Sequence, residues 1–262
     1  MTGLSRQITL VLATALTLVM NYLSQSLPLF GRTNADVSDA LPNAFTPAGL
    51  TFAIWGVIFT GLIVFAVYQA LPGQRGERYD RLFWPYLLSN LLNASWLLAF
   101  QSLNLGVSVL IMLALLASLI WLDRTLRGMN TTNTLTTPPP NRADFWALQV
   151  PTSLYLGWIS VATMANITAY LVSQGVTGGL LGLSPQAWSA ALLVIAGIVG
   201  MLMLTRFRDY TFAGVLLWAF LGVYLARPDA GTVTVGVVIG AALVVLAALR
   251  TLSMRRTHTA PA

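Results

Sequence analysis

The sequence contains no cysteine and a single histidine, His258, which lies in a polar C-terminal stretch. The lack of cysteine excludes structural disulfides and thiolate metal sites. Because the only histidine is in this tail, a histidine-based metal site or acid–base relay inside the apolar segments is excluded as well. Charged residues are also scarce, at 8% of 262 residues, whereas a soluble domain normally has about a quarter. These absences argue against metal binding and acid–base catalysis within the apolar segments.

Long apolar runs make up most of the chain. Hydrophobic residues account for 56% of the sequence, and its mean hydropathy is +0.75. Runs close to the roughly 20 residues that a helix needs to cross a bilayer recur along the whole length. Because open sheet edges cannot be satisfied in lipid, we predict an all-α polytopic membrane protein. The eight expected helices cover residues 8–28, 48–71, 82–103, 105–123, 145–172, 187–205, 211–226 and 232–250.

The basic residues predict how these helices are oriented. All 14 are arginines, and they outnumber the 8 acidic residues to give a net charge of +6. They lie in short connections at the ends of apolar runs, which is typical of orientation signals and gives no reason to expect nucleic-acid binding. Eight helices place Arg32 and Arg227 on one side of the membrane and all the other arginines on the opposite side. The positive-inside rule then predicts a multi-pass protein of the bacterial cytoplasmic membrane, with both termini in the cytoplasm.

The helix count divides the chain into three predicted regions. Residues 1–172 are expected to form a five-helix membrane domain, residues 173–250 a three-helix extension, and residues 251–262 a basic polar cytoplasmic tail. The longest polar connection, 128–142, is rich in Thr, Asn and Pro, which is typical of a solvated linker.

Two pairs of glycines in the extension predict close helix packing. Gly236 and Gly240 form a G-x-x-x-G pattern, and Gly197 with Gly200 provides another small surface. Small residues at this spacing let helix backbones approach each other in a membrane. The partner helix can belong to the same chain or to the second copy in a homodimer.

Uncharged polar and aromatic residues are concentrated in the first five helices. No charged residue is predicted near the middle of any span, which weakens an interpretation as an ion-coupled pump. Four of these helices carry a stripe of such residues on one face, at three- and four-residue steps. The stripes are Thr14, Thr17, Asn21 and Gln25; Ala48, Phe52, Trp55, Phe59 and Leu62; Ser89, Asn93, Trp96 and Phe100; and Tyr155, Trp158, Ala162, Asn166 and Tyr170.

Two interpretations of these stripes remain open. Asn, Ser and small residues can hold helices together by hydrogen bonds and close packing, with tryptophans at the membrane interface. Alternatively, the stripes converge on a mostly apolar pocket with a few polar groups, which is the usual form of a small-molecule site. Trp55, Trp96 and Trp158 lie well inside their helices, which disfavours a simple interfacial role.

Three motifs occur in order along the first five helices. Pro47, Trp55 and Phe59 give a proline, a tryptophan eight residues on and an aromatic four further, and NASW supplies Asn93 and Trp96. The stretch YLGWISVATMAN follows in the fifth helix. Over roughly residues 8–172, this set resembles the translocator protein family, also called tryptophan-rich sensory proteins (TspO/MBR-related). Ala44 and Thr46 stand where that family has a tryptophan and the first proline of a pair.

The resemblance implies a five-helix bundle that binds porphyrins or other hydrophobic ligands between helices one, two, three and five. Carried over by position, the ligand-binding residues would be Trp55, Phe59, Asn93, Trp96, Trp158 and Ala162, with Asn21, Pro47, Phe52, Tyr155 and Asn166 as supporting residues. Trp55 and Trp158 match positions implicated in light-dependent porphyrin breakdown by some bacterial members. The last three helices have no counterpart in the five-helix core.

We therefore expect a membrane-embedded binding or sensory protein for a hydrophobic, tetrapyrrole-like ligand such as a porphyrin or haem, which it moves or whose level it regulates. The expected partners are the lipid bilayer and the hydrophobic small molecule, with no required cofactor or metal. Without a nucleophile, paired carboxylates or a metal cluster, no enzymatic activity is expected, and slow light-dependent porphyrin breakdown is the one form of turnover left open. The alternatives are a passive carrier of a small uncharged or amphipathic solute, and a structural or assembly subunit of a membrane complex.

Overall fold

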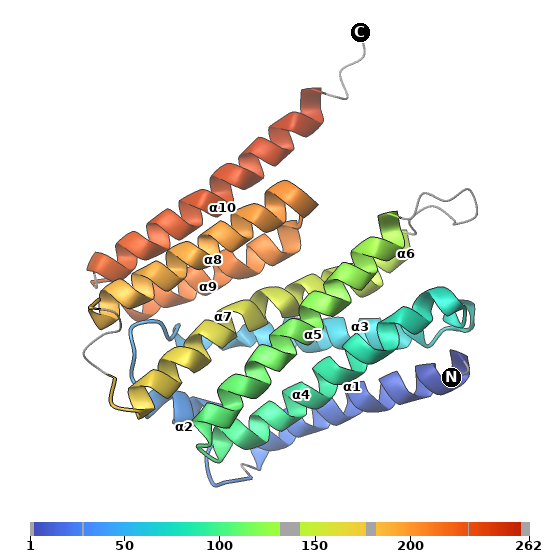
Figure 1. Cartoon of the computed structure of the whole chain (residues 1–262), viewed down its shortest axis with the longest axis horizontal. Helices are drawn as coiled ribbons and strands as arrows, with labels where there is room; N and C mark the ends of the chain where they lie inside the picture. The colour runs from blue at the N-terminus through green and yellow to red at the C-terminus, as the bar shows by residue number, and fades with distance from the viewer. Residues whose placement is uncertain (1–2, 28, 132–141, 177–181, 230, 258–262) are drawn as a thin grey trace. The chain divides into compact units, whose positions relative to one another are not determined.

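The computed structural model describes residues 3–27, 29–131, 142–176, 182–229 and 231–257, and its long elements are all helices (Figure 1). The eight predicted segments correspond one by one to α1 (Gly3–Ser26), α3 (Ile54–Gln69), α4 (Phe83–Gln101), α5 (Leu105–Thr131), α7 (Val150–Ser173), α8 (Pro185–Phe207), α9 (Tyr210–Ala226) and α10 (Gly231–Thr257). The shorter elements are α2 (Asn34–Asp39), η1 (Gly49–Ala53), η2 (Pro72–Gln74), η3 (Glu77–Leu82), α6 (Arg142–Asp144) and η4 (Phe145–Gln149). The predicted all-α fold is confirmed. Most of the predicted linker, and His258, lie outside the described residues.

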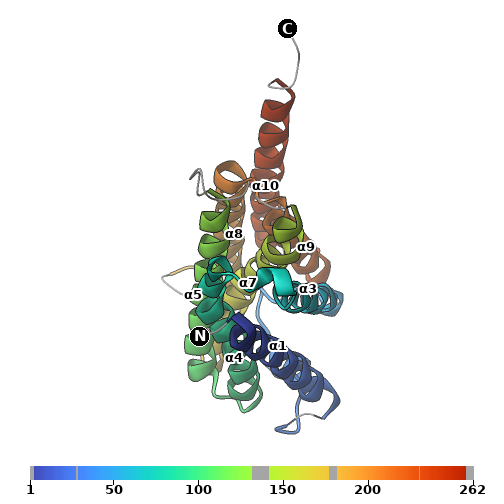
Figure 2. The ribbon, with the colours of Figure 1, turned by 90° about the vertical axis from the view of Figure 1, so that its right-hand side faces the viewer.

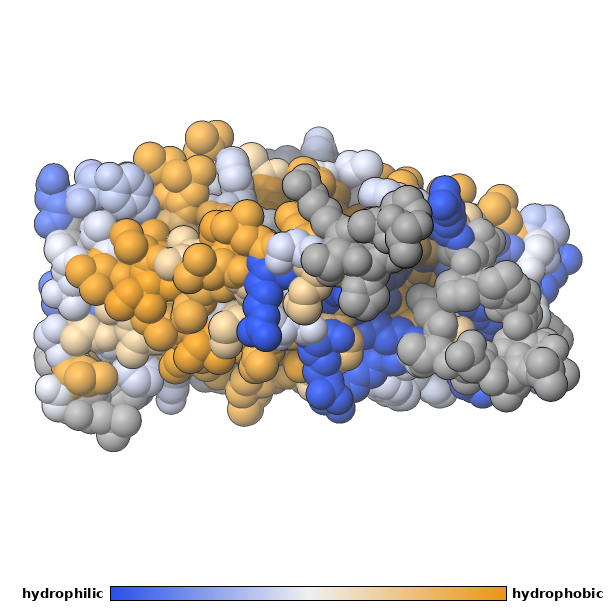
Figure 3. Space-filling model, turned by 90° about the horizontal axis from the view of Figure 1, so that it is seen from above, coloured by the Kyte–Doolittle hydropathy of each residue, from blue (hydrophilic) through white to orange (hydrophobic). Residues whose placement is uncertain are grey.

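Most of the long helices suit a bilayer. Six helical stretches of the described chain are long and apolar enough to cross a membrane, and α9 is a shorter apolar helix. The remaining long helix, α4, has 19 residues, but polar side chains such as Asn90 and Asn93 lower its hydropathy. Large hydrophobic side chains are exposed on many helices, and Figure 3 shows them covering much of one face. So much exposed apolar surface is expected against lipid, and the protein is an integral multi-pass membrane protein.

The chain forms two compact units. The first comprises Met1–Ala40 and Ala53–Ile159, and it includes α1, α3, α4, α5 and the start of α7. The second comprises Leu41–Phe52 and Ser160–Ala262, with the rest of α7 and helices α8, α9 and α10. These bounds differ from the predicted regions in two places. Residues 41–52, which precede α3, pack with the C-terminal helices, and the boundary between the units falls within α7, after Ile159.

A line of hydrogen bonds joins α1 to α4 in the first unit, where the two helices pack side by side (Figure 2). The hydroxyls of Thr14 and Tyr86 lie 2.8 Å apart, and the Thr17 hydroxyl donates to Oδ1 of Asn90 at 2.8 Å. All four side chains are buried, so each polar group needs a partner inside the protein. The stripe predicted on residues 8–28 therefore faces α4, except at its exposed end, Gln25.

A π-helical turn sets the start of α7. In this turn, η4, the N–H of Val150 donates to the carbonyl of Phe145, five residues earlier. Pro151 has no N–H to continue an ordinary helical ladder, and proline commonly forces such a local change. The ring of Pro151 lies against Gly61 of α3, where an added Cβ would be 3.2 Å from the proline Cβ. This close approach brings α7 beside α3.

Glycines allow α8 and α10 to pack closely in the second unit. A Cβ at Gly197 would lie 2.6 Å from Cα of Gly240, and one at Gly236 would lie 2.6 Å from Cα of Ala190. Both distances are too short for any other residue, so the glycines let the two backbones meet. The predicted G-x-x-x-G pattern is thus used within the chain, and a homodimer would have to use another surface.

Candidate ligand-binding site

An aromatic cluster forms where α3 meets α7. Trp55, in the first turn of α3, stacks on Phe59 of the next turn with ring centroids 5.3 Å apart. Its indole also makes edge contacts with Tyr155 at 6.1 Å and Trp158 at 6.3 Å. The four-residue step on α3 and the three-residue step on α7 each place two rings on one helix face. Four of the predicted residues therefore meet in one cluster.

Asn93 connects this cluster to α1. Its Nδ2 donates to the hydroxyl of Tyr155 at 2.7 Å, and its Oδ1 accepts from Nδ2 of Asn21 at 2.7 Å. Nδ2 of Asn21 also reaches the carbonyl of Thr17 at 2.8 Å. One amide on α4 thus links α1 and α7.

Exposure divides the cluster into a buried part and an accessible part. Trp158 and Tyr155 are each 2% exposed, and Asn93 is 1% exposed. Trp55 and Phe59 are only half-buried. Tyr155, Trp158 and Asn93 therefore form the buried base of the cluster. The rings of Trp55 and Phe59 provide its accessible apolar surface.

Trp96 forms a separate aromatic pair. It lies one turn beyond Asn93 on α4 and stacks on Phe100 of the same helix, with centroids 4.9 Å apart. Its side chain is half-buried, whereas that of Phe100 is buried.

Four predicted residues belong to the second unit, and the cluster is formed without them. Pro47 is buried and Phe52 is exposed, both in the segment before α3. Ala162 is half-buried and Asn166 is buried, both further along α7.

Comparison with known proteins identifies the family of the chain. A family model described as "TSPO-like protein" matches residues 7–250 of the chain. The chain belongs to the TSPO-like protein family. The match covers α8, α9 and residues 231–250 of α10, all of which lie beyond the stretch that contains the three motifs. No curated protein and no solved structure matches the chain.

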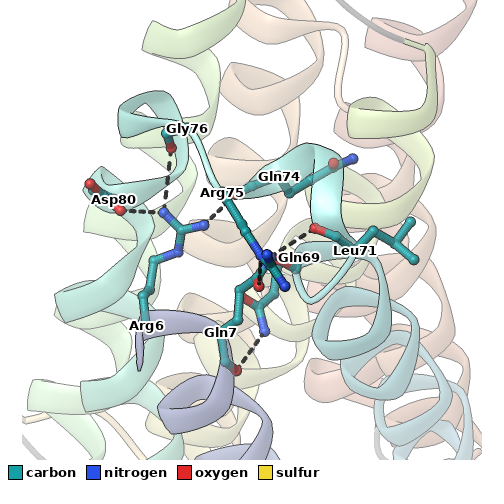
Figure 4. Close-up of polar contacts among 8 residues, drawn as sticks. All are labelled: Arg6, Gln7, Gln69, Leu71, Gln74, Arg75, Gly76 and Asp80. Carbon is teal, nitrogen blue, oxygen red and sulfur yellow. Dashed lines mark hydrogen bonds and ion pairs between the residues drawn. The ribbon is translucent and has the colours of Figure 1, made fainter. Parts of the chain in front are cut away.

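A hydrogen-bond network around Arg6 in this TSPO-like protein was not among the predicted site residues (Figure 4). The buried guanidinium of Arg6 bonds to the carboxylate of Asp80 and to the carbonyls of Gln74 and Gly76. These contacts join the start of α1 to the turn between α3 and α4. One feature of the sequence pointed to this network. The predicted orientation puts Arg6 on the same side of the membrane as the connection between α3 and α4, which contains Arg75.

Gln7 extends this network to the end of α3 (Figure 4). Its side-chain amide nitrogen, Nε2, donates to the carbonyls of Gln69 at 2.9 Å and Leu71 at 2.8 Å. Its Oε1 accepts from Nε of Arg75 at 3.2 Å. Gln69 is the last residue of α3, where the final carbonyls lack partners within the helix, and Gln7 binds its carbonyl.

Asp144 ties the start of α7 to the same end of the first unit. Its Oδ1 accepts from the hydroxyls of Tyr68 at 2.8 Å and Tyr79 at 3.0 Å, and its Oδ2 lies 3.0 Å from a guanidinium nitrogen of Arg78. Burial raises the pKa of the Tyr79 phenol, and the bond to Asp144 raises it further, so the hydroxyl remains a donor. The negative charge of Asp144 is thus paired with Arg78, and its carboxylate is also hydrogen-bonded, as expected of a buried residue that holds parts of the fold together.

The described residues of the TSPO-like chain contain no group of three or more His, Cys, Asp or Glu side chains that could hold a metal ion. The chemistry that the aromatic cluster can supply is stacking on its rings and hydrogen bonding at its base.

Proposed function

We propose that the protein binds a hydrophobic, tetrapyrrole-like ligand in the membrane and acts as a sensor or regulator of its level. The observation that carries this proposal is the cluster of Trp55 with Phe59, Tyr155 and Trp158. Half-exposed rings above a buried base give a flat ligand a surface on which to stack. Membership of the TSPO-like family supports a membrane protein of this type.

The cluster favours a metal-free porphyrin over haem. Haem is held through an axial ligand to its iron, which in proteins is His, Cys, Met or Tyr. Among the cluster residues only Tyr155 could serve, and its hydroxyl is buried and bonded to Asn93. Stacking on indole and phenyl rings requires no iron, so protoporphyrin is the probe of choice and haem the comparison.

Replacing Trp55 by Phe should weaken porphyrin binding. An aromatic contact contributes about 0.5–1.5 kcal/mol beyond its buried area, which corresponds to a roughly 2- to 12-fold rise in Kd. Titration of protoporphyrin into purified protein, followed by the shift of the porphyrin absorption band, measures this directly. We expect the same direction of change for Trp158→Phe.

Trp146→Phe is the matched control, because Trp146 is 66% exposed and lies outside the cluster. It removes one indole without touching the proposed site, and its Kd should equal that of the parent. Equal Kd values for the parent, Trp55→Phe and Trp158→Phe would remove the assignment of the site.

We further propose that the protein binds the porphyrin without carrying it across the membrane and without degrading it in the dark. The polar residues between α1 and α4 are hydrogen-bonded to one another, so they are poorly suited to exchanging partners with a moving solute. Porphyrin flux into proteoliposomes would contradict this and favour the passive carrier. Illumination of the complex, with Trp55→Phe and Trp158→Phe as comparisons, tests light-dependent porphyrin breakdown.

A further inference from the structure

The segment between α2 and α3 is attached to a helix from the far end of the chain. Residues 41–52, named here the α2–α3 strap, belong to the second unit. The N–H of Ala48 donates to the carbonyl of Gly222 at 2.9 Å, and Nε1 of Trp218 donates to the carbonyl of Thr51 at 2.8 Å. Both partners lie on α9, so the strap is held along that helix.

Arg227, directly after α9, makes the strongest contacts with the strap. Its guanidinium donates to the carbonyl of Thr46 at 2.7 Å and to the carbonyl of Asn43. Hydrogen bonds from a charged group are roughly twice as strong as those between neutral groups. The ion pairs found in the described chain join Arg6, Arg78 and Arg127 to aspartates, whereas Arg227 uses its charge on backbone carbonyls.

The strap is shaped to present these carbonyls. Oδ1 of Asn43 accepts from the N–H groups of Phe45 and Thr46, both at 3.0 Å, which forms a tight side-chain-stabilised turn. Phe45 is 1% exposed, although it lies in a connecting segment. A preformed turn with a buried aromatic loses little freedom when Arg227 binds it.

Gly222 allows the strap to pack closely against α9. A Cβ at this position would lie 2.0 Å from Oγ1 of Thr51, far inside van der Waals contact. Thr51 is 3% exposed, so its side chain has no free space to move into. The glycine is therefore required for the observed contact.

We propose that Arg227 is a positioning residue that holds the α2–α3 strap on α9 and thereby fixes the first turn of α3. Thr51 lies in η1, which continues directly into α3, and Trp55 follows four residues later. Movement of the strap therefore displaces the start of the helix that carries Trp55 and Phe59. The consequence for ligand binding rests on the proposed function, whereas the attachment itself does not.

Cysteine labelling tests the attachment directly, because the chain has no cysteine of its own. Thr51→Cys introduces one buried thiol into the strap, and maleimide labelling of this variant should be slow. Adding Arg227→Ala should accelerate labelling at least tenfold, and Arg227→Lys should give an intermediate rate. Arg250→Ala removes the same charge from an exposed position in the same unit and should leave the rate unchanged.

Gly222→Ala provides a second route to the same result. It displaces the strap by steric contact and keeps Arg227, so it should also accelerate labelling in the Thr51→Cys background. Size-exclusion profiles and thermal unfolding identify any variant that has lost its fold. An unchanged labelling rate in folded Arg227→Ala or Gly222→Ala protein would overturn the proposed attachment.

Porphyrin dissociation then tests the positioning role, without the engineered cysteine. Arg227→Ala should release bound protoporphyrin at least threefold faster than the parent, and Arg250→Ala should match the parent. Faster labelling with an unchanged dissociation rate would refute positioning and leave the attachment standing. Absence of porphyrin binding in the parent would instead refute the proposed function, and the labelling result would be unaffected.

Discussion

At the residue scale, Asn93 shows what helical periodicity can and cannot predict. The spacing of Ser89, Asn93 and Trp96 correctly predicts one face of α4, but it contains no information on which residues of other helices lie opposite. The structure provides the partners of Asn93, which are Asn21 and Tyr155. Its amide acts as a link between helices, as the first interpretation of the stripes expects, while the half-exposed Trp55 retains the features of the second.

Replacement of Asn93 by Leu should destabilise the protein by about 1–2 kcal/mol. The substitution leaves the buried Tyr155 hydroxyl without this partner and removes one of the two bonds of the half-buried Asn21 amide. Thermal or denaturant-induced unfolding in detergent, followed by circular dichroism, measures the difference. The control is Ser95→Ala on the same helix, because exposed Ser95 bonds only to the carbonyl of Leu91. Equal losses in the two variants would contradict the linking role.

At the element scale, the sequence predicted the long helices well and the irregular turns poorly. Apolar length alone located all eight helices, since a span needs about 20 apolar residues. The 3₁₀ segment η1 and the π turn η4 were not predicted from the sequence. η4 accompanies Pro151, whose missing N–H interrupts the helical ladder, and apolar length does not register such a local change. η1 is accompanied by contacts of Thr51 with distant residues of α9. Turn chemistry along the sequence does not show these neighbours.

Two glycine-to-alanine substitutions on adjacent helices should differ in their effect on stability. Gly240→Ala places a methyl group 2.7 Å from the carbonyl oxygen of Leu193 and should cost about 1–3 kcal/mol through overpacking. Gly214→Ala meets no atom within 4 Å on α9 and should be neutral or stabilising by up to about 1 kcal/mol through helix propensity. Unfolding midpoints in detergent compare the two directly. Similar destabilisation by both would contradict the tight packing of α8 against α10.

At the scale of the whole molecule, arginines gather at one end of each compact unit. In the first unit, Arg6, Arg75 and Arg78 join the ends of α1, α3 and α7 through the networks around Gln7 and Asp144. In the second, Arg206 and Arg208 lie at the α8–α9 connection. The hydroxyl of Tyr210, at the same connection, lies 2.9 Å from that of Thr251, next to Arg250. Within each unit, this grouping agrees with the predicted assignment of these arginines, and we propose that they face the cytoplasm.

Single cysteines can test this orientation without background labelling. Ala35→Cys, in exposed α2, should react with a membrane-impermeant maleimide on intact cells. Ala143→Cys, exposed in α6 at the opposite end of the spans, should react only after the membrane is opened. The reverse pattern would invert the assignment, and labelling of both in intact cells would contradict the helix count.

The division into compact units could not be predicted from the sequence. Because five predicted helices are followed by three more, the sequence predicts residues 1–172 and 173–250 as separate regions. The α2–α3 strap joins the C-terminal helices through Trp218, Gly222 and Arg227, and periodicity contains no signal for contacts between such distant segments. The aromatic cluster was easier to predict, because Trp55, Phe59, Tyr155 and Trp158 belong to helical stripes.

The attachment of the strap also has a consequence for biosynthesis. Thr46 and Arg227 are 181 residues apart in the chain. At synthesis rates of about 5–20 residues per second, the strap leaves the ribosome roughly 10–40 s before the arginine that binds it. Throughout this interval the carbonyls of Asn43 and Thr46 must be hydrated or held by another protein. A ribosome that stops before α9 therefore releases a chain whose first unit is fully translated but whose strap has no partner.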